Sequence, residues 1–149
     1  MAKKFRFPLD KVKKHREQLE QAAQRDFQLG QAALNAEIQK LEEMQSAVKK
    51  AMESRLDKTS VPALTQVHEF LAGQDIRIER QKIKIQEFEK QVEALREILR
   101  QKAIETKIIK ELEQRKFRDF IEEVRKKELR TQDDINLMRF RPEDDPEKK

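Results

Sequence analysis

The residues that could carry chemistry in this sequence are few and scattered. His15 and His68 are the two histidines, and neither has a second metal ligand three or four positions away. A metal site on a helix needs at least two ligands on one face at such spacings. Each histidine is therefore expected to be an ordinary residue on a helix surface.

Pairs of residues suited to catalysis are missing as well. There is no cysteine, and no serine has a neighbouring histidine. Gly30 and Gly73 are isolated from each other, whereas a phosphate-binding loop needs clustered glycines. The adjacent carboxylates Glu42-Glu43 and Asp133-Asp134 are typical of a solvated helix face. The sequence predicts that the protein is not an enzyme and has no catalytic residue, metal site or cofactor.

The composition favours long helices. Of 149 residues, 34 are basic and 29 acidic, a net charge of +5, and only two are Gly and four Pro. A compact domain uses about 7% Gly and 5% Pro to make its turns. No apolar run exceeds three residues, and no apolar segment follows the basic N-terminus, so we expect neither a membrane span nor a signal peptide. The composition therefore predicts an all-α protein, and the absence of cysteine fits a reducing compartment.

A first amphipathic helix is predicted over about residues 8–56, beginning at Pro8, whose fixed φ suits a first helical turn. Twelve positions from Val12 to Met52 recur at intervals of three or four, on average 3.64 residues per turn, as in an unstrained α-helix. Nine of the twelve are apolar if Ala counts. The positions hold Val12, Arg16, Leu19, Ala23, Phe27, Gly30, Leu34, Ile38, Leu41, Gln45, Val48 and Met52.

A turn over about residues 57–62 and a longer helix over about 63–140 follow. Pro62 disfavours a helix interior, and Thr59 and Ser60 are N-cap types. The second helix carries two columns spaced by seven, a pattern typical of a coiled-coil seam. One column is Leu71, Ile78, Ile85, Val92 and Leu99, and the other is Val67, Gln74, Gln81, Phe88, Leu95, Lys102 and Ile109. Residues 142–149 are predicted to be a disordered tail.

Two such helices joined by a short turn are expected to fold back as an antiparallel coiled coil, a single domain over residues 1–141. With the turn near residue 60, the numbers of facing residues add up to about 121. The shorter helix then ends opposite residue 116, which leaves residues 117–140 without a partner in the chain. Phe117 and Phe120 would be partly exposed there, as a binding surface for a partner, for a second copy, or for a curled N-terminus.

Positive charge is concentrated in two segments that the predicted hairpin brings to the same end, opposite the turn. Residues 1–25 carry a net charge of +5 and residues 115–130 a net charge of +3, whereas residues 26–114 are nearly neutral. Nucleic-acid binding is the less favoured explanation, because Asp10, Glu17 and Glu20 dilute the basic run and the middle offers no phosphate track. A generic coiled-coil scaffold, or a holdase-type chaperone that captures clients on its Phe stripe, is the main alternative to a specific partner.

Both ends of the chain resemble the FliJ family, small coiled-coil proteins of the bacterial flagellar type III export apparatus. The opening Phe5-Arg6-Phe7-Pro8-Leu9-Asp10-Lys11-Val12, followed by His15-Arg16-Glu17, is similar to the family's aromatic-basic-aromatic start. The segment from Arg125-Lys126-Lys127-Glu128 to Asp133-Asp134-Ile135-Asn136-Leu137-Met138-Arg139-Phe140 resembles its ending. Asn136 stands where the family often has Ala.

The resemblance implies an antiparallel hairpin like the coiled coil of the rotary ATP synthase γ subunit. It implies a central stalk in the hexameric flagellar export ATPase, a link to the export gate membrane protein, and escort of export chaperones, in a cytoplasmic protein peripherally associated with the inner membrane at the flagellar base. Phe70 and Leu71 are the implied gate contacts, with seam packing as the alternative favoured for Leu71. The expected ATPase contacts, including the two Phe residues of the overhang, are Arg16, Glu17, Phe117, Phe120, Arg125, Lys127, Asp133 and Arg139.

Overall fold

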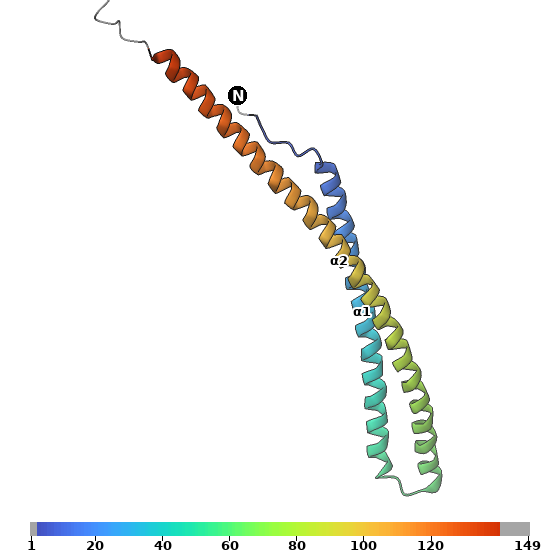
Figure 1. The fold of residues 1–149 in the computed structure, drawn as a ribbon. Helices are drawn as coiled ribbons and strands as arrows, with labels where there is room; N and C mark the ends of the chain where they lie inside the picture. The colour runs from blue at the N-terminus through green and yellow to red at the C-terminus, as the bar shows by residue number, and fades with distance from the viewer. Residues whose placement is uncertain (1–2, 141–149) are drawn as a thin grey trace, which may run out of the picture. The chain divides into compact units, whose positions relative to one another are not determined.

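The described part of the chain, residues 3–140 of the computed structural model, consists of two long α-helices (Figure 1). Helix α1 spans Asp10–Arg55 and helix α2 spans Val61–Arg139, and no strand occurs in this range. The prediction of an all-α helical hairpin with a longer second helix is confirmed. The segment predicted to be a disordered tail, residues 142–149, lies outside the described residues.

The turn between the helices occupies residues 56–60, slightly earlier than the sequence predicted. Ser60 caps α2, since its Oγ accepts the amide N–H of Ala63 at 3.4 Å and its carbonyl accepts that of Leu64 at 3.1 Å. Val61 and Pro62 are therefore the first two residues of α2, whereas the sequence analysis placed them in the turn. Pro62 is tolerated because amides in a first helical turn have no intrahelical acceptor.

The chain divides into two compact units, which are described separately. Unit 2, Arg16–Ile104, is a helical hairpin in which α1 and α2 lie side by side and antiparallel (Figure 1). Its core cluster is Leu34, Ile85 and Val92, with Phe27, Ile38, Leu41 and Phe88 packed against it. Every residue of the two heptad columns within this unit is buried or half-buried, as a coiled-coil seam requires.

The alignment of the two helices in unit 2 agrees with the predicted register. Glu37 of α1 forms an ion pair with Lys84 of α2, and these residue numbers add up to 121. Gly30 allows a close approach, because a Cβ built there would lie 2.7 Å from Cδ1 of Leu95 and 3.7 Å from Cγ2 of Val92. The small residue on α1 thus makes room for two large ones on α2.

Unit 1 comprises Met1–His15 and Glu105–Lys149, of which residues 3–15 and 105–140 are described. A non-helical segment, residues 3–9, precedes α1, and the Asp10 N–H donates to the Phe7 carbonyl at 3.2 Å. Phe7, Thr106 and Ile109 are buried, and Lys13 Nζ donates to Glu113 Oε2 at 2.7 Å. Unit 1 therefore has its own, smaller set of buried side chains.

The prediction that residues 117–140 have no partner in the chain was wrong for the beginning of that stretch. Phe5 of the N-terminal segment contacts the rings of Phe117 and Phe120. The alternative of a curled N-terminus therefore describes this part of unit 1. Beyond Val124, all residues from 125 to 140 are exposed.

Within residues 3–140, neither helix contains a stretch apolar enough to cross a lipid bilayer. The same range contains no group of three or more His, Asp or Glu side chains arranged to bind a metal ion.

Candidate partner-binding surfaces

An aromatic cluster joins the N-terminal segment to α2 in unit 1. The Phe5 and Phe117 ring centroids lie 5.3 Å apart at 72°, an edge-to-face contact, and those of Phe5 and Phe120 lie 5.6 Å apart at 47°. Aromatic pairs in such geometries stabilise by about 0.5–1.5 kcal/mol beyond the area they bury. Phe117 remains 46% exposed, so the cluster keeps an apolar surface open to a partner.

A groove continues from this cluster along α2. Phe120, Val124 and Ile135 give it an apolar lining, and Lys3 reaches it from the N-terminal segment. Glu123, Lys127, Glu128, Thr131 and Gln132 make up the rest of its walls. The groove lies beyond the aromatic contacts, on a part of α2 that is mostly exposed.

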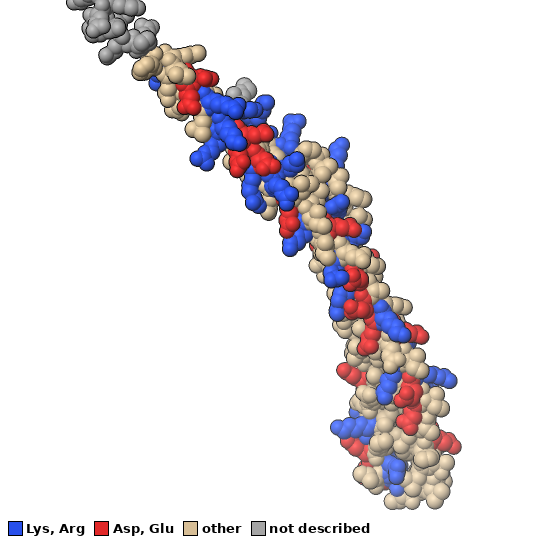
Figure 2. Space-filling model, viewed as in Figure 1, with Lys and Arg blue, Asp and Glu red and all other residues tan. Residues whose placement is uncertain are grey.

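The net charge of the described chain resides entirely in unit 1. Its described residues carry 16 Lys and Arg against 10 Asp and Glu, a net charge of +6, whereas unit 2 carries 15 of each. Figure 2 shows Lys and Arg side chains gathered along the α2 part of unit 1 on the face in view. A surface of this kind favours a partner with acidic groups and accelerates its association.

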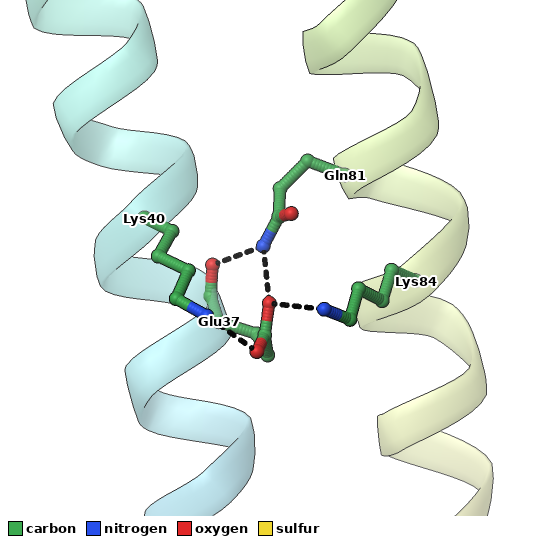
Figure 3. Close-up of polar contacts among 4 residues, drawn as sticks. All are labelled: Glu37, Lys40, Gln81 and Lys84. Carbon is green, nitrogen blue, oxygen red and sulfur yellow. Dashed lines mark hydrogen bonds and ion pairs between the residues drawn. The ribbon is translucent and has the colours of Figure 1, made fainter.

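A buried polar cluster interrupts the seam of unit 2 (Figure 3). Glu37 is only 6% exposed. Gln81 Nε2 donates to the Glu37 carboxylate at 2.7 Å and to its backbone carbonyl at 2.8 Å. Lys40 Nζ lies 3.0 Å and Lys84 Nζ 3.5 Å from the same carboxylate. The Gln81 hydrogen bond, followed by that from Lys40, lowers the pKa of Glu37 from 4.5 to about 2.

The sequence comparison adds a decisive observation to this geometry. The model of the FliJ family, described as flagellar FliJ protein, matches residues 5–144, nearly the whole chain.

This chain belongs to the FliJ family.

The resemblance noted at the two ends of the sequence is thereby confirmed. Neither a curated protein nor a solved structure gave a match to this sequence. Membership of the FliJ family implies a role related to flagellar type III export, as a non-enzymatic component of that apparatus.

The contacts expected from the FliJ family resemblance are divided between the two units. Phe117 and Phe120 share the contact with Phe5, and Phe120 and Lys127 line the same groove. Arg16 and Glu17 belong to unit 2, where both are half-buried.

The remaining expected ATPase contacts lie on the exposed end of α2. Arg125 and Arg139 are exposed, and Arg139 is the last residue of the helix. Asp133 lines a shallow hollow with Asn136, Leu137 and Phe140. Within residues 3–140, Arg125, Asp133 and Arg139 make no ring contact, hydrogen bond or ion pair with the aromatic cluster.

The two expected gate residues differ in exposure. Phe70 is 43% exposed, whereas Leu71 is 8% exposed and lies in the seam. Gly73 is exposed as well, and a Cβ built there would meet nothing within 4 Å. Val61, Leu64, Ile76 and Ile83 of α2 are exposed as well, so Phe70 is one of several exposed apolar residues on this helix, whereas Leu71 is buried.

Sequence reasoning missed several residues of these surfaces. The sequence analysis named Phe5 only in the opening that resembles the FliJ family, although Phe5 makes contacts between the N-terminal segment and α2. It also passed over Glu37, because counting apolar positions ignores a buried carboxylate. The available signal was Gln81, a polar residue in a heptad column, which requires a partner when buried.

Proposed function

We propose that this FliJ-family protein is the non-enzymatic central stalk of the flagellar export ATPase ring, with unit 1 entering the ring. The observation that carries the proposal is the aromatic, cationic end. Unit 1 holds the whole net charge of the described chain, together with partly exposed Phe117 and an apolar groove. A ring whose lining offers acidic and apolar groups is the complementary partner.

The contacts proposed with the ring combine two kinds of interaction. Phe117 and Phe120 supply apolar area, and aromatic side chains are common binding hot spots. Exposed cations on α2 steer the approach and fix the orientation. The proposed ring contacts are Arg16, Glu17, Phe117, Phe120, Arg125, Lys127, Asp133 and Arg139.

Unit 2 is proposed to carry the contact with the export gate. Phe70 and the apolar residues Ile76 and Ile83 are exposed on α2 and available to a partner. Leu71 is proposed to contribute to this contact only indirectly, because its buried side chain packs in the seam between α1 and α2 and so positions α2. Binding to a membrane-embedded gate would also place the protein peripherally at the inner membrane of the flagellar base, where it escorts export chaperones.

Truncation of α2 tests the stalk proposal. A variant lacking residues 117–149 is expected to lose stimulation of the export ATPase while unit 2 stays helical. Phosphate release measures the stimulation of the ATPase, and circular dichroism at 222 nm measures the helix content. The double variant F117A/F120A should lose most of the stimulation with the helix length unchanged. Undiminished stimulation by both variants would contradict the proposal.

The holdase or scaffold alternative retains one supporting observation. Ile121, Leu129, Leu137 and Met138 are exposed on α2, and unpaired apolar side chains can capture unfolded clients. Suppression of aggregation of an unrelated unfolded protein distinguishes the two functions. A holdase would suppress aggregation equally at low and high salt, whereas the stalk is expected to show no such activity.

A further inference from the structure

We propose that the N-terminal segment and α2 together form one cationic cradle for an acidic protein segment, and that Phe5 is the positioning residue that joins the two halves. The proposal deepens the stalk function above and rests on it for the identity of the partner. None of the cations of the N-terminal segment is among the ring contacts already named. The cradle is defined as Lys3, Lys4, Arg6 and Lys116, with Asp119 and Glu123.

The first step is that Phe5 attaches the segment to α2. Within residues 3–9, Phe7 is buried and the carbonyls of Phe7 and Leu9 accept hydrogen bonds from α1, so the later part of the segment is held without Phe5. Phe5 makes the ring contacts of the part that precedes Phe7. The Phe5 ring contacts both Phe117 and Phe120, more than 100 residues further along the chain. A single hollow is lined by Lys3, Lys4 and Arg6 on one side and by Lys116, Asp119 and Glu123 on the other.

The second step concerns the unbalanced charge of the cradle. Lys3, Lys4, Arg6 and Lys116 take part in none of the ion pairs recorded within residues 3–140. The nearby carboxylates of Asp10 and Glu113 are paired with Lys13, and that of Glu111 is paired with Lys107. Four cations therefore surround a hollow that contributes two carboxylates of its own, and an acidic partner would find complementary charge there.

The third step identifies the partner as a protein segment. The cations are gathered in one small cradle, whereas duplex DNA is bound along a longer track of phosphates. Asp119 and Glu123 can accept hydrogen bonds from the amide groups of a polypeptide, which a phosphate backbone does not provide. The exposed ring of Phe117 beside the cradle offers an apolar contact that a polypeptide can use. An acidic segment with an apolar side chain satisfies all these groups.

The role of Phe5 follows from preorganisation. Replacing Phe5 by Ala leaves every charge in place but removes both ring contacts, so Lys3 and Lys4 are held less firmly beside Lys116, while buried Phe7 still anchors the segment next to Arg6. The effective concentration of these cations at the cradle then falls. We expect F5A to weaken partner binding about tenfold, the equivalent of about 1.4 kcal/mol. F5L, which keeps an apolar side chain, should restore part of the loss.

The experiment measures binding of the full chain to the flagellar export ATPase at low and high salt, about 0.05 and 0.3 M. The variants are F5A, F5L and K3A/K4A/R6A, with K49A/K50A/K58A as the matched control. The control removes three positive charges as well. Its lysines are exposed in unit 2 and form no ion pair within the described residues. At low salt, F5A and K3A/K4A/R6A should slow association and flatten its salt dependence, whereas the control should behave as wild type.

Two results would overturn the cradle. One is F5A binding with wild-type rate and salt dependence. The other is equal weakening by the unit 2 control. A Phe5 that only stabilised the fold would lower the melting temperature of F5A without changing the salt dependence of association, so that pattern also counts against the proposal.

Three further probes separate failure of the cradle from failure of the stalk function. They are a glutamate-rich helical peptide, duplex DNA, and vesicles containing phosphatidylserine. If the ATPase does not bind wild type but the peptide binds in a Phe5-dependent manner, the stalk function fails and the cradle stands. Binding to DNA or vesicles without binding to the peptide overturns the partner class, and binding to none of the probes overturns the cradle.

Discussion

The two glycines show how the surroundings of a single residue decide the effect of a substitution. Gly73 is exposed within α2, and an added Cβ would meet nothing within 4 Å. Since Ala is a better helix former than Gly, G73A is expected to raise the free energy of unfolding by about 0.5–1 kcal/mol. Urea denaturation followed by circular dichroism measures the change.

Gly30 provides the matched comparison. An added Cβ there would lie 2.7 Å from Leu95 Cδ1, so the leucine must change its position in the seam. Such overpacking typically costs about 1–3 kcal/mol, which offsets the gain in helix propensity. G30A should therefore be less stable than G73A, and equal stability of the two variants would mean that the helices are not this close at Gly30.

Glu37 gives the protein a specific acid sensitivity. Its pKa is lowered from 4.5 to about 2 in the folded chain, first by the Gln81 hydrogen bond and then by Lys40. A carboxylate whose pKa is depressed by folding stabilises the fold above its unfolded pKa. That stabilisation is expected to disappear as the pH falls from about 4.5 to about 2.

The variant E37Q isolates this contribution. Its free energy of unfolding should vary less between pH 5 and pH 2 than that of the wild type, because the position no longer titrates. E43Q, at an exposed position on the same helix, serves as the control and should retain the wild-type pH profile. Identical profiles for E37Q and wild type would show that Glu37 is not stabilised as a carboxylate.

At the scale of the elements, the Glu37–Gln81 cluster favours the observed alignment of the two helices. Apolar layers tolerate a shift by one heptad, whereas a buried carboxylate needs its donors opposite. Gln81 and Lys84 of α2 supply them only when they face Glu37 of α1. A shift by one heptad that brings Phe88 opposite Glu37 removes the donor, whereas the opposite shift brings Gln74 and Arg77 there and supplies a similar pair. The cluster therefore disfavours slippage in one direction more than it adds stability.

Single and double substitutions separate these two roles. Q81L leaves Glu37 buried without its closest donor and should destabilise the hairpin by about 1–3 kcal/mol. E37L/Q81L replaces both partners by apolar groups and should be as stable as wild type or more so. The double variant should also populate additional registers or oligomers, visible by disulfide trapping between cysteines introduced on the two helices and by light scattering. A uniquely aligned monomer would contradict the register role.

At the scale of the whole molecule, the sequence predicted the features that depend on periodicity. The 3.6-residue spacing located both helices, and the heptad columns identified the residues that are covered in unit 2. The segment before α1 has no period, and its contact between Phe5 and Phe117 joins residues at opposite ends of the chain. No local pattern encodes such a contact, so the sequence analysis offered a curled N-terminus only as one alternative and did not identify Phe5 as the residue that makes the contact.

That attachment leads to a prediction about self-association. A variant lacking residues 2–7 removes the Phe5 ring from Phe117 and Phe120, and leaves both on an uncovered face of α2. Exposed apolar stripes on helices promote pairing between copies. The variant should bind more of a hydrophobic dye and sediment with a concentration-dependent mass, whereas F5A should show a smaller effect in the same direction. Deletion of residues 143–149 is the control, because it shortens the chain without altering the aromatic cluster. If the N-terminal deletion stays monomeric and binds no additional dye, the segment does not cover apolar surface, and the attachment through Phe5 must be abandoned.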